Sequence, residues 1–171
     1  MEKTIDPAHE IGENVTITER SQLLSITPEQ AKKIKSLRIE NQTIDDDFRD
    51  FLLSINRFDS LYFYRCSVDC LTLSGVYQCN TLGFVDCSLT SMSVTFVLDE
   101  LMRLEYVEIL DLSNNRIGVD PEPFCQWWTR TISGVVGVKK LILSDNDFLD
   151  ASKARVLSDF GKYSPGCQVV F

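Results

Sequence analysis

One spacing of residues recurs five times along this chain of 171 residues, and it constrains the fold more than any other feature. In each copy the first, fourth, sixth and eleventh positions are apolar, while the ninth holds Asn, Cys or Gln. The five copies begin at Ile34, Phe58, Cys79, Val107 and Val138. Because each copy repeats the same register, the pattern predicts a stack of similar units in which neighbouring copies bury one another's apolar faces.

The fourth and sixth positions follow the two-residue period of a strand, so each copy is expected to centre on a short β-strand. Apolar residues at helical spacing predict helices around 48–55, 94–102, 124–132 and 154–160, the last ending at Gly161. The segment 69–78 has room for only a turn or a short helix. Counting 28 residues on from Leu141 and Leu143 predicts a sixth strand at 167–171.

The first part of the chain follows the spacing poorly. We interpret residues 1–33 as an N-terminal cap and residues 34–171 as the repeat domain of about five repeats plus a terminal strand. Within the cap, Val15 and Ile17 predict a leading strand, and 27–30 predicts the start of a helix.

The ninth position is where a strand turns away and leaves backbone groups unpaired. Asn can both donate and accept hydrogen bonds there, as we expect of Asn115 and Asn146. Cys66 and Cys87 are expected to fill the same buried slot as small, weakly polar residues.

The segments 107–117 and 138–148, with Leu-x-Leu-Ser-x-Asn at their centres, resemble leucine-rich repeats. The long intervals and the Cys variants resemble the ribonuclease-inhibitor-like and cysteine-containing classes. This resemblance implies an α/β leucine-rich-repeat solenoid, with a concave parallel β-sheet and helices on the convex side. It also implies that the concave face binds protein partners.

Charge and composition exclude several classes of protein. The net charge of −8 argues against a nucleic-acid partner, which would need a stripe of Lys and Arg. We expect no membrane span, because no apolar run approaches about 20 residues. The start of the chain lacks the layout of an export signal, so we expect a cytoplasmic protein with reduced thiols.

No catalytic residue, metal site or cofactor is expected. Cys66 and Cys70 have a spacing compatible with zinc, but Cys66 lies at a repeat position that the fold should bury. His9 is the only histidine, and nothing places it near a nucleophile. Trp127 and Trp128 are interpreted as mainly core residues.

The fifth, seventh and eighth positions should point into the hollow of the concave face. Tyr and Arg gather there toward the N-terminal half, and both types are enriched at interface hot spots, whereas Asp residues make the other half acidic. The predicted partner-binding residues are Arg38, Glu40, Tyr62, Tyr64, Arg65, Asp86, Asp111 and Asp145.

The sequence therefore favours a non-catalytic protein–protein interaction module, with Arg38 and Arg65 pairing to carboxylates of the partner. One alternative is a regulator of a small GTPase that acts through Arg116. Another is a structural protein that forms a homo-oligomer through the open edge of its C-terminal strand at 169–171. A solvated sheet face without a partner is the remaining interpretation.

Overall fold

The computed structural model describes residues 11–68, 78–100, 107–131 and 137–171. Seven strands form one sheet in the order β1–β2–β4–β6–β7–β8–β9, and every neighbouring pair is parallel. Their bounds are β1 (Asn14–Ile17), β2 (Ser36–Glu40), β4 (Arg57–Tyr64), β6 (Gln78–Val85), β7 (Ile109–Asp111), β8 (Lys140–Ile142) and β9 (Gln168–Val170). A second, two-stranded parallel sheet joins β3 (Thr43–Ile44) to β5 (Ser67–Val68).

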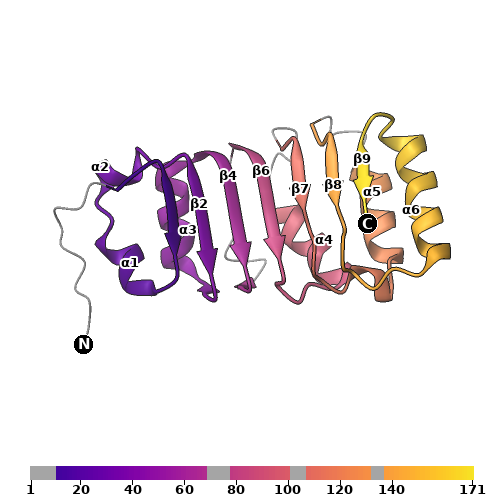
Figure 1. Cartoon of the computed structure of the whole chain (residues 1–171), viewed down its shortest axis with the longest axis horizontal. Coiled ribbons are helices and arrows are strands. Elements are labelled where there is room, and N and C mark those ends of the chain that lie inside the picture. The colour runs from indigo at the N-terminus through magenta and orange to yellow at the C-terminus, as the bar shows by residue number, and fades with distance from the viewer. Residues whose placement is uncertain (1–10, 69–77, 101–106, 132–136) are drawn as a thin grey trace.

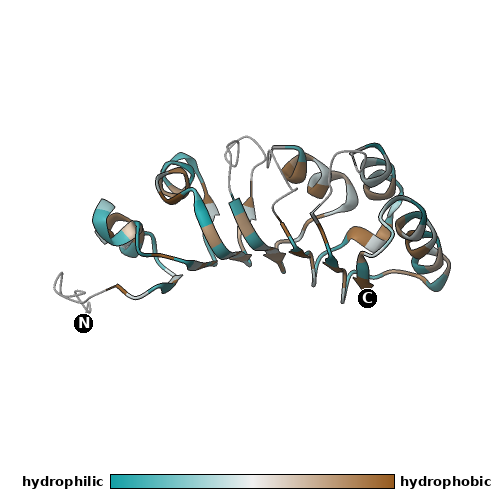
Figure 2. Ribbon diagram, turned by 90° about the horizontal axis from the view of Figure 1, so that it is seen from above, coloured by the Kyte–Doolittle hydropathy of each residue, from teal (hydrophilic) through white to brown (hydrophobic). Residues whose placement is uncertain are grey.

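The helices are α1 (Arg20–Ser25), α2 (Pro28–Ala31), α3 (Asp46–Ile55), α4 (Ser91–Glu100), α5 (Glu122–Thr131) and α6 (Asp150–Tyr163), with a 3-10 turn η3 (Ile117–Val119). Helices α3 to α6 lie behind the large sheet (Figure 1). Seen from above, the sheet curves, and its helix-free face is on the inside of the curve (Figure 2). The core fills the space between sheet and helices.

The register of the sheet follows the repeated spacing in every copy. The fourth positions stand opposite one another from strand to strand: Leu37 faces Leu61, Leu61 faces Leu82, Leu82 faces Leu110, Leu110 faces Leu141 and Leu141 faces Val169. All of these leucines are buried. The strand predicted at the C-terminal end is therefore confirmed as β9, in the predicted register.

The same sheet extends toward the N-terminus. The predicted leading strand is confirmed as β1, in which Val15 faces Leu37 and Ile17 faces Ile39. The predicted helix start is also confirmed, because the Thr27 side chain accepts a hydrogen bond from the Gln30 N–H at the start of α2. The division into a cap at 1–33 and a repeat domain at 34–171 stays a prediction.

The predicted helices form, with two corrections, both in α6. Helix α6 continues past Gly161 to Tyr163, so the prediction that Gly161 ends the helix was wrong. Its buried face also differs from the predicted one: Leu157 is 50% exposed, while Val156 and Phe160 are buried. Val156 and Phe160 lie one turn apart, and Phe160 stacks on Trp128 of α5, which sets the face that α6 presents to the core.

Some predictions fall on parts of the chain that the structure does not describe. These are the short connection at 69–77, the ends of two helices (Leu101, Met102 and Ile132), and the residues His9 and Cys70. Among the helices that the structure does describe, none combines the length and apolar character needed to cross a membrane.

The half-buried Gln42 of the first copy donates to the Thr18 carbonyl, and from the second copy on the ninth positions form a ladder of buried side chains that joins the copies. Each side chain donates to the backbone carbonyl of the sixth position in the preceding copy: Cys66 Sγ to Ile39 (3.3 Å), Cys87 Sγ to Phe63 (3.4 Å), Asn115 Nδ2 to Phe84 (2.7 Å) and Asn146 Nδ2 to Leu112 (2.8 Å). The two Asn side chains also accept from backbone N–H groups of the preceding copy, namely those of Cys87 and Leu89 for Asn115 and of Ile117 for Asn146. The predicted role of the ninth position is confirmed.

Gly118 in η3 marks a close approach between the backbones of two copies. A Cβ atom at Gly118 would lie 2.3 Å from the Asn146 carbonyl oxygen and 2.5 Å from the Phe148 backbone nitrogen. Backbone atoms of the next copy cannot move aside as a flexible side chain can. We therefore expect Gly118→Ala to lower the free energy of unfolding by about 1–3 kcal/mol, measured by urea denaturation. Gly12→Ala, where a Cβ meets nothing within 4 Å, is the matched control. An unchanged midpoint for Gly118→Ala would contradict this close contact.

Candidate functional site

Two tyrosines of β4 stand on the helix-free face of the sheet. Tyr62 and Tyr64 alternate along the strand with the buried residues Leu61 and Phe63, as the two-residue period requires. Arg38 lies opposite Tyr62 on β2, and Arg65 directly follows Tyr64. We call these four residues, Arg38, Tyr62, Tyr64 and Arg65, the tyrosine–arginine patch.

The Tyr64 ring lies between two guanidinium groups. The Cζ of Arg38 is 4.5 Å from the ring centroid and that of Arg65 is 5.0 Å from it, both within the range of a cation–π contact. Each arginine also pairs with a carboxylate of this chain: Arg38 with Glu40, and Arg65 Nε with Asp86 Oδ2 at 2.7 Å. The hydrogen bond to Asp86 raises the pKa of Arg65. Both arginines therefore have carboxylate partners before any other protein binds.

The Tyr62 ring lies across Gly83 of β6. A Cβ atom at Gly83 would be 2.2 Å from Tyr62 Cδ1 and 2.3 Å from Cε1, so the ring occupies the place that a side chain would take. Burial is the main cause that raises the pKa of the Tyr62 phenol, and the Asp111 carboxylate raises it further, while Arg38 lowers it. Because Gly83 has no side chain, the Tyr62 ring lies against the sheet and close to Asp111.

The patch stands on the most extensive strand pair of the sheet. β4 and β6 are each eight residues long, whereas β7, β8 and β9 have three residues each. Directly beneath the patch, the Phe63 and Phe84 rings stack with centroids 4.9 Å apart and planes 6° apart. We infer that the backbone under Tyr62 and Tyr64 is firmly held by ladder hydrogen bonds and core packing.

The eighth position has a backbone requirement that the sequence interpretation missed. In all five copies this residue adopts a left-handed conformation, with φ between 51° and 56°: Asn41, Arg65, Asp86, Asn114 and Asp145. Asn and Asp tolerate this conformation better than other side chains do. The turn therefore accounts for four of the five residues, and Arg65 is the exception. The sequence did contain a signal for this turn, because four of the five eighth positions hold Asn or Asp.

The predicted acidic residues do not act as one cluster. Asp86 pairs with Arg65, Asp111 Oδ1 accepts a hydrogen bond from the Ser113 N–H at 3.0 Å, and Asp145 is exposed on its turn. Within the described ranges, no group of three or more His, Cys, Asp or Glu side chains is arranged to hold a metal ion. Whether any of the eight predicted residues contacts a partner stays a prediction.

The cysteines of the repeat positions are buried, as predicted. Cys66, Cys79 and Cys87 are buried, and so is Cys125. Burial raises the pKa of Cys79 and of Cys87 to about 12, and that of Cys125 to about 11. A raised thiol pKa keeps these groups neutral in the folded protein, so the stability they contribute is complete below the ordinary value and falls as pH rises above it.

We expect these thiols to resist alkylation. When the folded protein is treated with iodoacetamide at pH 8, Cys79 and Cys87 should be labelled no faster than the protein unfolds. Their thiolate forms are scarce, and the side chains are inaccessible to the reagent. Site-resolved mass spectrometry measures this, with the protein in urea as the control in which both react. Rapid labelling of either residue in the folded protein would contradict their burial.

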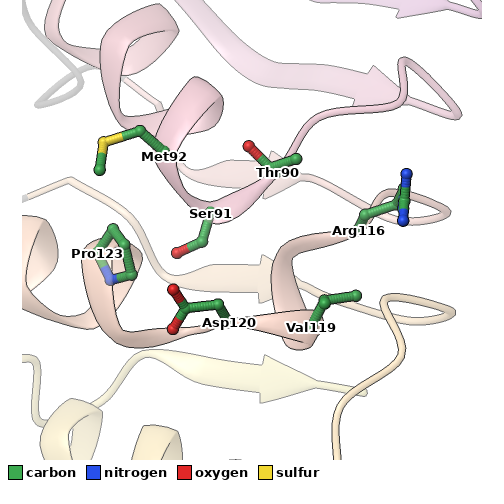
Figure 3. Close-up of a pocket in the computed structure, with 7 residues that line it drawn as sticks. All are labelled: Thr90, Ser91, Met92, Arg116, Val119, Asp120 and Pro123. Atoms are coloured by element: carbon green, nitrogen blue, oxygen red, sulfur yellow. The ribbon is translucent and has the colours of Figure 1, made fainter.

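Arg116, the candidate for a GTPase-regulating role, lies away from the patch. Its exposed side chain stands at one end of a shallow hollow of about 250 Å³, lined also by Met92, Val119 and Pro123 (Figure 3). The hollow lies between the start of α4 and the turn before α5. Ser91 at its floor is already engaged, because its Oγ accepts a hydrogen bond from the Phe124 N–H at 2.7 Å.

β9 forms the edge of the described sheet beyond β8. The Phe171 ring that follows β9 packs edge-on against Phe148, with centroids 5.2 Å apart. Self-assembly through this edge stays a prediction.

Comparison with known families finds one match. The family model described as Leucine Rich Repeat matches residues 106–127, which contain β7, the ninth-position Asn115, η3 and the first part of α5. This match supports a leucine-rich repeat at the fourth copy. Comparison with curated proteins finds no match, and neither does comparison with solved structures.

Proposed function

We propose that this chain is a leucine-rich-repeat solenoid of the ribonuclease-inhibitor-like class, and that it is a non-catalytic module that binds a protein partner on its concave face. The family match at 106–127 supports the repeat. The shared register of the other copies supports its extension along the chain. The leucine-rich-repeat family consists in general of interaction modules without catalytic activity.

One observation carries the proposal: both tyrosine rings are held in place by this chain before any partner arrives. Tyr64 lies between two guanidinium groups and Tyr62 lies on Gly83. Association costs free energy for every side chain that must be ordered, so rings already held in place lose less on binding. Large rigid aromatic residues beside Arg are also the commonest hot-spot types.

The proposed contact surface is centred on the tyrosine–arginine patch and extends along the sheet. In the bound state Arg38 keeps its pair with Glu40, and Arg65 keeps its pair with Asp86. The two arginines therefore orient the Tyr64 ring in addition to facing carboxylates of the partner. Asp111 and Asp145 mark the far part of the surface. We also propose a cytoplasmic location, because the four buried thiols of the core suit a reducing compartment.

The test is partner capture with a double variant. Tyr62→Ala with Tyr64→Ala should lose the proteins that the wild-type chain retains from a lysate of its own cell type, identified by mass spectrometry. The matched control is Phe96→Ala with Tyr163→Ala, which removes two exposed aromatic rings outside the patch. Circular dichroism should show both variants folded. If the folded patch variant retains the same proteins as wild type, the proposed binding site is wrong.

A further inference from the structure

The Asp111 carboxylate lies beside the tyrosine–arginine patch. In the sheet register Tyr62 faces Gly83, and Gly83 faces Asp111, so Asp111 stands two strands from Tyr62 on the same face. Within the part of the chain that the structure describes, Asp111 has no ion pair, and its Oδ1 accepts only from the Ser113 N–H. Among the described residues, no group donates a hydrogen bond to Asp111 Oδ2.

We infer that Tyr62, Gly83 and Asp111 form a cradle for an arginine side chain of the protein partner. This inference rests on the proposed function, and it adds the chemistry of the partner. The guanidinium stacks on the open face of the Tyr62 ring and donates hydrogen bonds to Asp111.

The shape of the cradle follows from Gly83. Because Gly83 carries no side chain, the Tyr62 ring lies over the middle strand, and no side chain of Gly83 stands between the ring and Asp111. The electrostatic influence of Asp111 on the pKa of Tyr62 is consistent with their closeness. Half-buried Val85 and Ile142, on the same face, offer apolar contact to the methylene groups of an incoming side chain.

The charges select a cation. The chain carries a net charge of −8, which attracts a basic partner over a distance. The nearby arginines cannot neutralise Asp111, because Arg38 pairs with Glu40 and Arg65 with Asp86. An arginine suits the cradle better than a lysine: its guanidinium is planar, stacks on an aromatic face and donates hydrogen bonds in a fixed fork.

The test uses a small probe, so that it does not depend on knowing the partner. N-acetylarginine methylamide is titrated into the isotope-labelled protein, and the Gly83 amide and the Tyr62 ring protons are followed by NMR. We expect saturable shifts at both, with a Kd on the order of millimolar. The citrulline analogue has the same shape without the charge and should give no saturable shift.

Two variants locate the binding. Asp111→Asn keeps an acceptor for the Ser113 N–H but removes the charge. It should raise the Kd of the arginine probe about tenfold. Asp147→Asn removes an exposed carboxylate outside the proposed contact surface, at a left-handed backbone position that tolerates Asn, and should leave the Kd unchanged. N-acetyllysine methylamide is titrated in the same way. The inference is overturned if the arginine probe does not bind, if the citrulline or lysine analogue binds equally well, or if Asp111→Asn binds the arginine probe like wild type.

Partner capture separates this inference from the proposed function. If Asp111→Asn loses capture as the tyrosine double variant does, the cradle is part of the partner site. If Asp111→Asn captures the same proteins as wild type while the tyrosine double variant does not, the proposed function holds and the arginine cradle is wrong. If the tyrosine double variant also captures normally, the proposed function itself is wrong.

Discussion

Asn115→Leu is expected to lower the free energy of unfolding by about 2–6 kcal/mol. Asn115 is 4% exposed, and its Oδ1 accepts from the backbone N–H groups of Cys87 and Leu89 at 3.1 and 3.0 Å. Leucine fills the same space but offers no acceptor, so two buried N–H groups lose their partners, at about 1–3 kcal/mol for each. Because a domain of this size is stable by only about 5–15 kcal/mol, the loss should appear as a large fall in the urea midpoint.

Two companion variants test whether the lost hydrogen bonds are the cause. In Asn146→Leu the expected loss is smaller, because among the described residues Asn146 Oδ1 accepts from one backbone N–H group, that of Ile117. Asn115→Cys should lie between wild type and leucine, since the thiol at Cys87 already donates to a carbonyl of the preceding copy. Equal losses at Asn115 and Asn146 would show that the number of orphaned N–H groups does not set the effect.

Trp128→Ala is expected to cost about 3–5 kcal/mol, the range for truncating a buried tryptophan. The Trp128 side chain is 1% exposed, and its ring stacks on Phe160 with centroids 4.2 Å apart. Its Nε1 donates to Ser164 Oγ at 3.2 Å, just beyond the end of α6. The variant therefore removes the main packing between α5 and α6 and leaves a large cavity. Thermal and urea unfolding followed by circular dichroism measure the loss.

The damage from Trp128→Ala should be greatest near the C-terminal end. Strands and helices contact mainly their sequence neighbours, so we expect hydrogen exchange to accelerate first in α6 and β9 while β2 and β4 stay protected. Trp128→Phe keeps an aromatic ring and is the control; it should lose about half as much stability. Uniform acceleration across all strands would instead indicate that the whole sheet unfolds as one unit.

The register of the sheet could be predicted because it depends on a pattern that every copy repeats. Leu37, Leu61 and Leu110 are each weak evidence alone, but their common spacing predicts that they face one another, as they do. The same spacing predicted β9 and the burial of Cys66 and Cys87. The end of α6 could not be predicted in this way. Its length and buried face depend on Phe160 packing against Trp128, a contact between two copies.

The sequence could predict the candidate site only as groups of residues that share a repeat position. The spacing indicated which residues share the helix-free face, but it could not indicate that Tyr62 lies across Gly83, since side-chain direction depends on the neighbouring strand. Nor could it show that Arg38 and Arg65 both have carboxylate partners and enclose Tyr64. The left-handed backbone of the eighth position was missed because Asp86 and Asp145 were interpreted by charge alone.

The left-handed turn after each strand determines how sequence differences at the eighth position should be interpreted. An exchange between Asn and Asp at Asn41, Asn114 or Asp145 is tolerated by the backbone, so the left-handed turn by itself explains why either residue stands there. Arg65 is different, because arginine gains nothing from φ = 51°. If related chains that diverge elsewhere keep a bulky cation at the position of Arg65, the side chain is selected for the surface that it forms and not for the fold.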